Sequence, residues 1–162
     1  LVPASHPLAS VHGAMNAVFV EGAAAGPLMW EGAGAGGRPT ASAVVGDVVE
    51  ALRNRASNRR SPFPEVEDEL TMFPAGELQH AFYVTVDVLD RPGVLAAVTT
   101  VFGEHGVSIR SMEQTGAGDE AKLLFTTHVA LTSDMQATLE DLQQLDVVDA
   151  IGVCLPILEV AP

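Results

Sequence analysis

The fold of the second half of this 162-residue chain is decided by the stretch FYVTVDVLDRPGVL at residues 82–95. Apolar and polar residues alternate up to residue 88, which predicts a half-buried β-strand. The turn Asp90-Arg91-Pro92-Gly93 ends the alternation, and Pro92 suits the first turn of a helix. Apolar residues then recur at helical spacing up to Phe102. The stretch therefore predicts a strand, a turn and an amphipathic helix in succession.

Four more elements are predicted downstream. His105-Gly106 ends the helix, because Gly suits a left-handed cap and His suits the negative end of the helix dipole. The segments that follow are a strand at 107–114, a hairpin loop at 116–119, a strand at 122–131, a helix capped by Thr132 or Ser133 with Met135, Leu139, Leu142 and Leu145 on one face, and a strand at 147–158. Pro156 indicates that the later part of the last strand lies at a sheet edge.

The predicted order is strand, helix, strand, strand, helix, strand. This is the split βαβ, ferredoxin-like arrangement, so the predicted fold class is α+β, with both helices on one face of four strands. A domain of about 80 residues is small for independent stability. Its open sheet edge and uncovered face would gain from pairing with a second copy, which predicts a homo-oligomer.

The turn at residues 90–95 has the form Asp-x-Pro-Gly-x-Leu, and Gly106-Val107-Ser108-Ile109 leads into the next strand. In both features the segment resembles the ACT family of regulatory domains, and the resemblance implies a sensor of a small molecule, namely an amino acid. Gly93 lets a ligand carboxylate approach backbone N–H groups at a helix N-terminus, and Asp90 can receive an ammonium group. The expected effector-binding residues are Asp90, Arg91, Pro92, Gly93, Val94 and Leu95. The alternative is that this turn merely starts a helix.

A glycine-rich loop at residues 32–37 dominates the first part of the chain and runs into Pro39. The spacing predicts a helix over 40–52, with Val44, Val45, Val48, Val49 and Leu52 as its apolar stripe. The loop is not a Rossmann fingerprint, because that motif needs a βαβ unit and an acidic residue about 20 positions on. It also lacks the Gly-Lys-Ser/Thr of a phosphate-binding Walker loop. By its chemistry alone, it fits either an anion site at a helix N-terminus or a flexible connection into a helix.

Three blocks in this part resemble the end of the catalytic region of homoserine dehydrogenase: HPLASV at 6–11, NAVFVE at 16–21 and GAGAGGRPTASAVVGD at 32–47. The resemblance implies an enzyme that interconverts L-homoserine and L-aspartate 4-semialdehyde with NAD(P). It also implies that Gly36 contacts the nicotinamide nucleotide, with Gly34 and Gly37 as weaker candidates. The family's Rossmann domain, catalytic lysine and acidic substrate-binding residues lie upstream. No catalytic residue is therefore assigned, and the chain alone is expected to be an inactive part of a longer protein.

The chain is predicted to divide into three parts. Residues 1–56 form an α/β remnant of the homoserine dehydrogenase catalytic domain, residues 57–79 a proline-containing linker, and residues 80–162 the ACT regulatory domain. Charge supports the division, since residues 79–162 carry 12 acidic and 3 basic groups, whereas residues 1–56 carry 4 and 3. The bacterial members of the family commonly place an ACT domain after such a linker.

The composition excludes several classes of function. A net charge of −13 argues against binding to nucleic acid or to an anionic membrane surface. The single cysteine, Cys154, excludes an internal disulfide and is expected to lie in the core. The five histidines show no metal-ligand spacing, so no metal site is proposed. Nothing resembles a secretory signal or a membrane span, which leaves the cytoplasm as the expected compartment.

Two interpretations of the whole chain remain open. In the first, the ACT domain senses threonine, the end product of the pathway, and regulates homoserine dehydrogenase. In the second, the chain is an amino-acid-binding or dimerisation module that regulates a different amino-acid enzyme. The glycine-containing block at 32–47 favours the first, because the second has no use for it.

Overall fold

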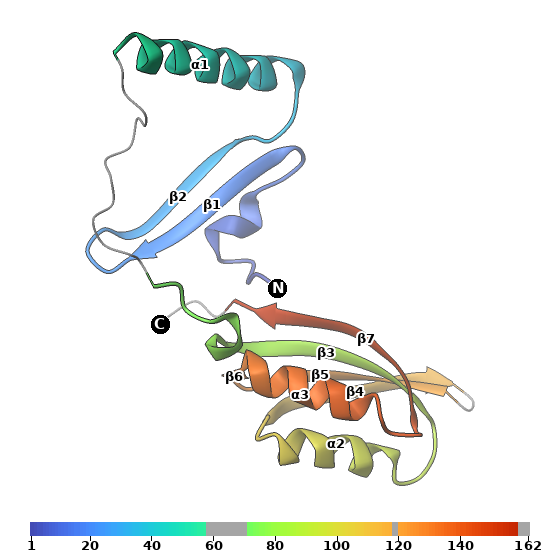
Figure 1. Cartoon of the computed structure of the whole chain (residues 1–162). Helices are drawn as coiled ribbons and strands as arrows, with labels where there is room; N and C mark the ends of the chain where they lie inside the picture. Colours follow the sequence, from blue (N-terminus) through green and yellow to red (C-terminus); the bar gives the residue numbers. More distant parts are fainter. Residues whose placement is uncertain (58–70, 118–119, 159–162) are drawn as a thin grey trace. The chain divides into compact units, whose positions relative to one another are not determined.

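The computed structural model in Figure 1 describes residues 1–57, 71–117 and 120–158. The chain separates into two compact units. One unit contains Leu1–Pro3 and the chain from Met72 onward, and the other contains Ala4–Thr71. Most of the predicted linker lies outside the described residues. The short 3-10 helix η2 (Ala75–Glu77) and Gln79, the first residue of the next strand, also fall in the predicted range 57–79.

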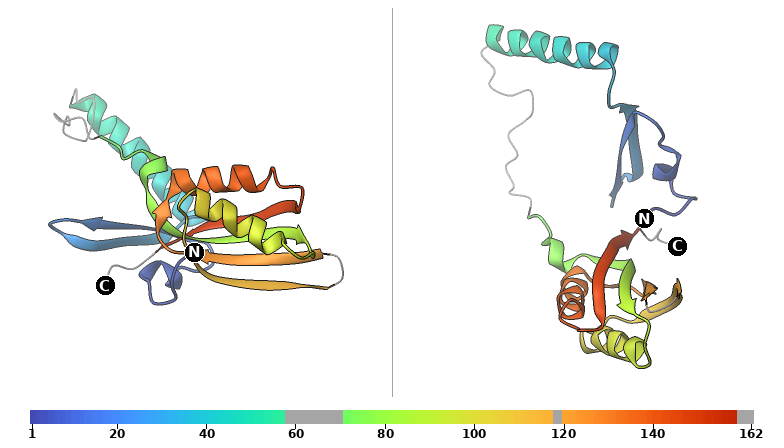
Figure 2. Two further views of the ribbon diagram at one scale, coloured as in Figure 1. Left: turned by 90° about the horizontal axis from the view of Figure 1, so that it is seen from below. Right: turned by 90° about the vertical axis from the view of Figure 1, so that its right-hand side faces the viewer.

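The C-terminal unit is a five-stranded antiparallel sheet with two helices on one face (Figure 2). Its four long strands are β3 (Gln79–Leu89), β4 (Ile109–Ala117), β5 (Glu120–Thr127) and β7 (Val148–Ile157), in the order β4-β5-β3-β7, and the fifth strand has two residues. The helices are α2 (Val94–Glu104) and α3 (Thr132–Leu142). The predicted ferredoxin-like α+β fold is confirmed, and Pro156 lies in the outer strand β7, as expected.

The core of this unit follows from the alternation in β3. Phe82, Val84, Val86 and Val88 are buried towards the helices, because every second residue of a strand faces the same side. They meet buried residues from the neighbouring strand and both helices, among them Leu123, Phe125, Val98, Phe102, Met135 and Leu142. The rings of Phe102 and Phe125 lie 5.0 Å apart. Each such side chain contributes roughly 1.5–3 kcal/mol of hydrophobic stabilisation.

Two buried threonine hydroxyls accept backbone N–H groups where the sheet is irregular. The hydroxyl of Thr127 accepts the Phe82 N–H at 2.9 Å, at the point where β5 ends. The predicted strand 122–131 is consequently wrong as a single element: it is β5 followed by the short β6 (Ala130–Leu131), which pairs with the start of β3. On the other side of β3, the Thr85 hydroxyl accepts the Val153 N–H at 2.8 Å beside an irregularity in the β3–β7 register.

Both helix starts differ from the sequence prediction. Helix α2 begins at Val94, so Pro92 lies in the preceding turn, and Gly93 is the N-cap with a left-handed φ of +92°. The N-cap of α3 is Leu131, and neither Thr132 nor Ser133 caps it. The Thr132 hydroxyl instead donates to the Leu78 carbonyl at 2.9 Å, a bond that local sequence does not reveal.

The remaining boundaries differ by small amounts. Strand β4 begins at Ile109, two residues after the predicted start, and it includes Gly116 and Ala117 of the predicted hairpin loop. The rest of that loop, residues 118–119, lies outside the described residues. Gly106 has a φ of +70° after α2, as the predicted left-handed cap requires.

The N-terminal unit contains a β-hairpin and one long helix. Strands β1 (Met15–Gly22) and β2 (Gly26–Ala33) pair antiparallel, and α1 (Gly37–Ala56) extends the helix predicted at 40–52 in both directions. A 3-10 turn, η1 (Pro7–Ser10), precedes the hairpin. Before this turn, buried His6 packs edge-on against Phe19, and its Nδ1 accepts the Leu8 N–H at 3.1 Å.

The apolar stripe predicted for α1 is present but uncovered. Its five residues, Val44, Val45, Val48, Val49 and Leu52, are 40–60% exposed. The hairpin likewise exposes Val18 and Trp30, which form a cross-strand pair. Within the described residues, α1 therefore has no buried side chain. No helix in these ranges is long and apolar enough to cross a membrane.

Candidate effector and nucleotide sites

The turn after β3 encloses a cavity of about 220 Å³. All six residues of the predicted effector site line it, from Asp90 to Leu95, together with Val88, Leu89, Gln114 and Leu123. Val94 is buried and forms part of the wall, whereas Asp90 and Arg91 are exposed. The structure thus brings the predicted residues together around one concave surface.

Gln114 is a lining residue that the sequence analysis missed. It lies on β4 opposite Leu123, and its Nε2 donates to Asp90 Oδ1 at 3.3 Å. Position 114 is 24 residues from Asp90, so only the register of the β4–β5 hairpin places it beside the turn. The sequence signal that could have placed Gln114 beside the turn is the alternation of residues along β4 and β5.

The first turn of α2 offers donors to an anion. Gly93 has no side chain that could cap the helix, and the N–H groups of Leu95 and Ala96 find no backbone acceptor among the described residues. These groups lie at the positive end of the helix dipole, which favours a carboxylate. The carboxylate of Asp90 beside them suits a cation. One turn therefore presents complementary partners for both charges of an α-amino acid.

Lys122, the single lysine of the chain, lies on the sheet face opposite the helices. Its Nζ is 3.2 Å from Asp87 Oδ1, and both side chains are partly exposed. Together with Thr115 and Asp149 they line an open cavity of about 540 Å³. The lysine is thus engaged in an ion pair within the C-terminal unit.

The glycine loop leads from β2 into α1. Gly36 is the N-cap of α1 with a φ of +127°, and Gly37 is the first helical residue. The N–H groups of Gly37 and Arg38 have no backbone acceptor among the described residues, and the first turn contains no acidic side chain. The N-terminus of this 20-residue helix is therefore open to an anion.

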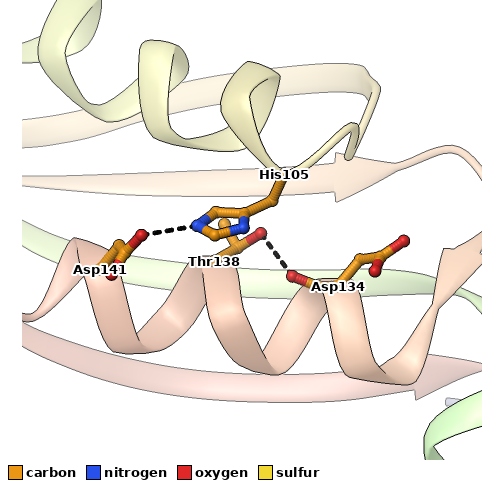
Figure 3. Close-up of polar contacts among 4 residues, drawn as sticks. All are labelled: His105, Asp134, Thr138 and Asp141. Atoms are coloured by element: carbon orange, nitrogen blue, oxygen red, sulfur yellow. Dashed lines mark hydrogen bonds and ion pairs between the residues drawn. The ribbon is translucent and has the colours of Figure 1, made fainter.

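His105 ends α2 and connects it to α3 (Figure 3). Its Nε2 lies 2.7 Å from Asp141 Oδ2. Nearby, the buried Thr138 hydroxyl donates to the Asp134 carbonyl at 2.7 Å within α3. His105 accordingly has a specific carboxylate partner in addition to the helix dipole that the sequence suggested.

The other candidate ligands are dispersed. Across the described ranges, no three His, Cys, Asp or Glu side chains are grouped so that they could hold a metal ion. Cys154 was expected inside the core but is only partly buried and packs against it, and this burial raises the pKa of the thiol.

Two known families match different parts of the chain. Residues 1–49 match the homoserine dehydrogenase family, and residues 82–147 match the ACT domain. The chain is 48% identical over 152 residues to homoserine dehydrogenase of Corynebacterium glutamicum, covering 94% of this chain and 34% of that protein. It is 46% identical over 158 residues to the Mycobacterium tuberculosis enzyme, covering 94% and 36%. The chain thus spans about a third of the length of these relatives.

A solved structure shows the same relationship. The crystal structure of a homoserine dehydrogenase from Thiobacillus denitrificans superimposes with a TM-score of 0.75 at 32% identity. The similarity covers 98% of this chain and 37% of that chain. Both parts of this chain are therefore similar to parts of one solved homoserine dehydrogenase.

Proposed function

Because this chain belongs to the homoserine dehydrogenase family and carries an ACT domain at residues 82–147, we propose that it forms the end of the catalytic region and the regulatory domain of an enzyme that interconverts L-homoserine and L-aspartate 4-semialdehyde with NAD(P). The observation that carries the proposal is the presence of both matches in one chain, in this order. An ACT module for a different amino-acid enzyme would not need the match at residues 1–49.

The start of α1 supports a role in holding the nicotinamide nucleotide. The loop offers backbone without side chains at Gly34, Gly36 and Gly37. The first helical turn adds N–H groups that have no backbone acceptor in the described part of the chain, and it contains no carboxylate. These features fit an anionic cofactor. Gly36 would be the main backbone contact, with Gly34 and Gly37 beside it. When bound, the nucleotide supplies or accepts the hydride.

The ligand proposed for the cavity at residues 90–95 is an amino acid, and specifically threonine, as feedback inhibitor. Asp90 would receive the ammonium group, and the N–H groups after Gly93 would receive the carboxylate. The two sites would be coupled only if threonine binds two states of the enzyme with different affinity. Calorimetric titration of the chain with threonine and a panel of other amino acids tests the choice. Heat with another amino acid and none with threonine would overturn it.

A homodimer through the ACT domain is also proposed. The sheet face opposite the helices exposes apolar side chains such as Leu155, which pairs with the half-buried Tyr83. An apolar sheet face of this kind gains stability from a partner. The mass of the chain in solution, measured by light scattering, would be twice 16.9 kDa. The compartment proposed for the enzyme is the cytoplasm.

The activity itself is tested with two proteins. The complete polypeptide should oxidise homoserine with NAD(P)⁺, whereas the 162-residue chain should not, because the proposed cofactor domain and catalytic lysine lie upstream. Turnover by the 162-residue chain would refute its predicted inactivity. No turnover by the complete, folded polypeptide would refute the proposed activity.

A further inference from the structure

The open cavity beside Lys122 is built on the sheet of the C-terminal unit, on the face opposite the helices. Thr115 on β4 lies opposite Lys122 on β5. Lys122 in turn lies opposite Asp87 on β3, and Asp87 lies opposite Ala150 on β7. These residues form one row across the sheet, with neighbouring strands about 4.8 Å apart. The register of the sheet therefore sets the positions of Thr115, Lys122 and Asp87.

Asp149 joins this cavity through an irregularity in β7. Asp87 pairs with Ala150, whereas the next residue of β3, Val88, pairs with Val148. One step along β3 thus corresponds to two steps along β7, which makes Asp149 the extra residue of a β-bulge. Bulges re-aim side chains and are common beside functional sites. Asp149 lines the cavity, so the bulge adds a second carboxylate to the one that Asp87 supplies.

The polar groups of the cavity differ in charge. The ammonium group of Lys122 has several N–H donors, and Asp87 Oδ1 lies 3.2 Å from its Nζ. The remaining donors and the Thr115 hydroxyl suit a carboxylate. Asp87 and Asp149 suit ammonium groups. Two carboxylates and one ammonium group give the cavity a formal charge of −1, which favours a ligand with a net positive charge.

We propose that this cavity is a second ligand site, for a free α-amino acid with a basic side chain. The ligand carboxylate meets Lys122 and Thr115, and its two ammonium groups meet Asp87 and Asp149. The cavity has a volume of about 540 Å³, compared with about 220 Å³ at residues 90–95, and so has room for a longer side chain. The site goes beyond the proposed function, since it requires neither dehydrogenase activity nor threonine binding.

The site is distinct from the two surfaces already assigned to the C-terminal unit. Val88 and Leu89 line both cavities, but the charged residues of the two cavities are different. Tyr83, on the surface proposed for the second copy, lies four residues before Asp87 along β3, or roughly 13 Å away. A substitution at Asp149 therefore tests this cavity alone.

The first test is calorimetric titration of the complete polypeptide with L-lysine, L-norleucine and cadaverine. L-Norleucine lacks the side-chain ammonium group of L-lysine, and cadaverine lacks its carboxylate. L-Lysine should bind, and each of the other compounds should bind about fivefold more weakly, because one ion pair is lost. No heat with L-lysine would overturn the proposal. Equal binding of L-lysine and cadaverine would also overturn it, because the acidic surface alone would then attract both.

The second test repeats the L-lysine titration with variants. Asp149→Asn should weaken binding about fivefold. Asp146→Asn is the matched control, because it removes the same charge from an exposed residue that does not line the cavity, and it should change binding at most about twofold. Equal losses for the two variants would overturn the proposal. Circular dichroism and thermal melting establish that each variant is folded.

Asp90→Ala separates this site from the effector site. It should leave L-lysine binding unchanged, because Asp90 does not line this cavity. Loss of L-lysine binding in this variant would place the ligand at residues 90–95 and overturn the proposal. Absence of homoserine oxidation or of threonine binding would instead refute the proposed function and leave the L-lysine result as it stands.

Discussion

The two units of this chain use apolar residues in opposite ways. In the C-terminal unit the apolar faces of β3, α2 and α3 meet each other, and residues such as Val84, Val98 and Leu142 are fully buried. In the N-terminal unit the apolar stripe of α1 and one face of the hairpin are exposed. An amphipathic pattern therefore predicts a helix or strand but does not identify what packs against its apolar face. The C-terminal unit should therefore respond to substitutions as a packed domain, and α1 should not.

The largest expected effect separates the two units directly. Leu142→Ala removes a fully buried side chain and should lower the free energy of unfolding by about 2–5 kcal/mol. Leu52→Ala on α1 removes a side chain that is 60% exposed and should cost less than about 0.5 kcal/mol. Urea unfolding followed by circular dichroism measures both. Similar losses for the two variants would show that α1 is packed in solution.

A second prediction concerns the break between β5 and β6. Thr127→Val keeps the shape of a buried side chain but removes the hydroxyl that accepts the Phe82 N–H. The orphaned donor should cost about 1–3 kcal/mol in unfolding free energy. Thr126→Val, at the neighbouring half-buried position, is the control and should change stability little. If the two variants were equally stable, the Thr127 hydroxyl would not stabilise the chain at the end of β5.

A third prediction tests the turn that forms the cavity. Gly93→Ala places a side chain at φ +92° and should cost roughly 1–2 kcal/mol. Gly103→Ala, inside the same helix and with open space around it, should instead stabilise by up to about 1 kcal/mol. Thermal melting distinguishes the two. Stabilisation by both substitutions would mean that the turn relaxes to an ordinary conformation.

The smallest expected effect belongs to the His105–Asp141 pair. The pair is partly exposed, so its contribution should be about 1 kcal/mol or less and should weaken at high salt. A double-mutant cycle with His105→Gln and Asp141→Asn, at 0.1 M and about 1 M NaCl, isolates this term. A coupling energy that does not change with salt would argue against an ion pair.

Sequence patterns predicted the α+β fold because the alternation in β3 and the helical spacing in α2 are local signals. The same reasoning placed the six residues at 90–95 in one turn. It missed Gln114, the break after Thr127 and the start of α3, because each depends on a partner more than 20 residues away.

We propose that the C-terminal unit regulates a homoserine dehydrogenase by binding threonine in the cavity lined by Asp90–Leu95. Its most direct test is the inhibition of the complete enzyme by threonine, measured for the unsubstituted protein and for Asp90→Ala. We expect threonine to inhibit the unsubstituted protein and Asp90→Ala to raise the inhibition constant at least about tenfold, because the ammonium group loses its carboxylate. Unchanged inhibition of Asp90→Ala would contradict it.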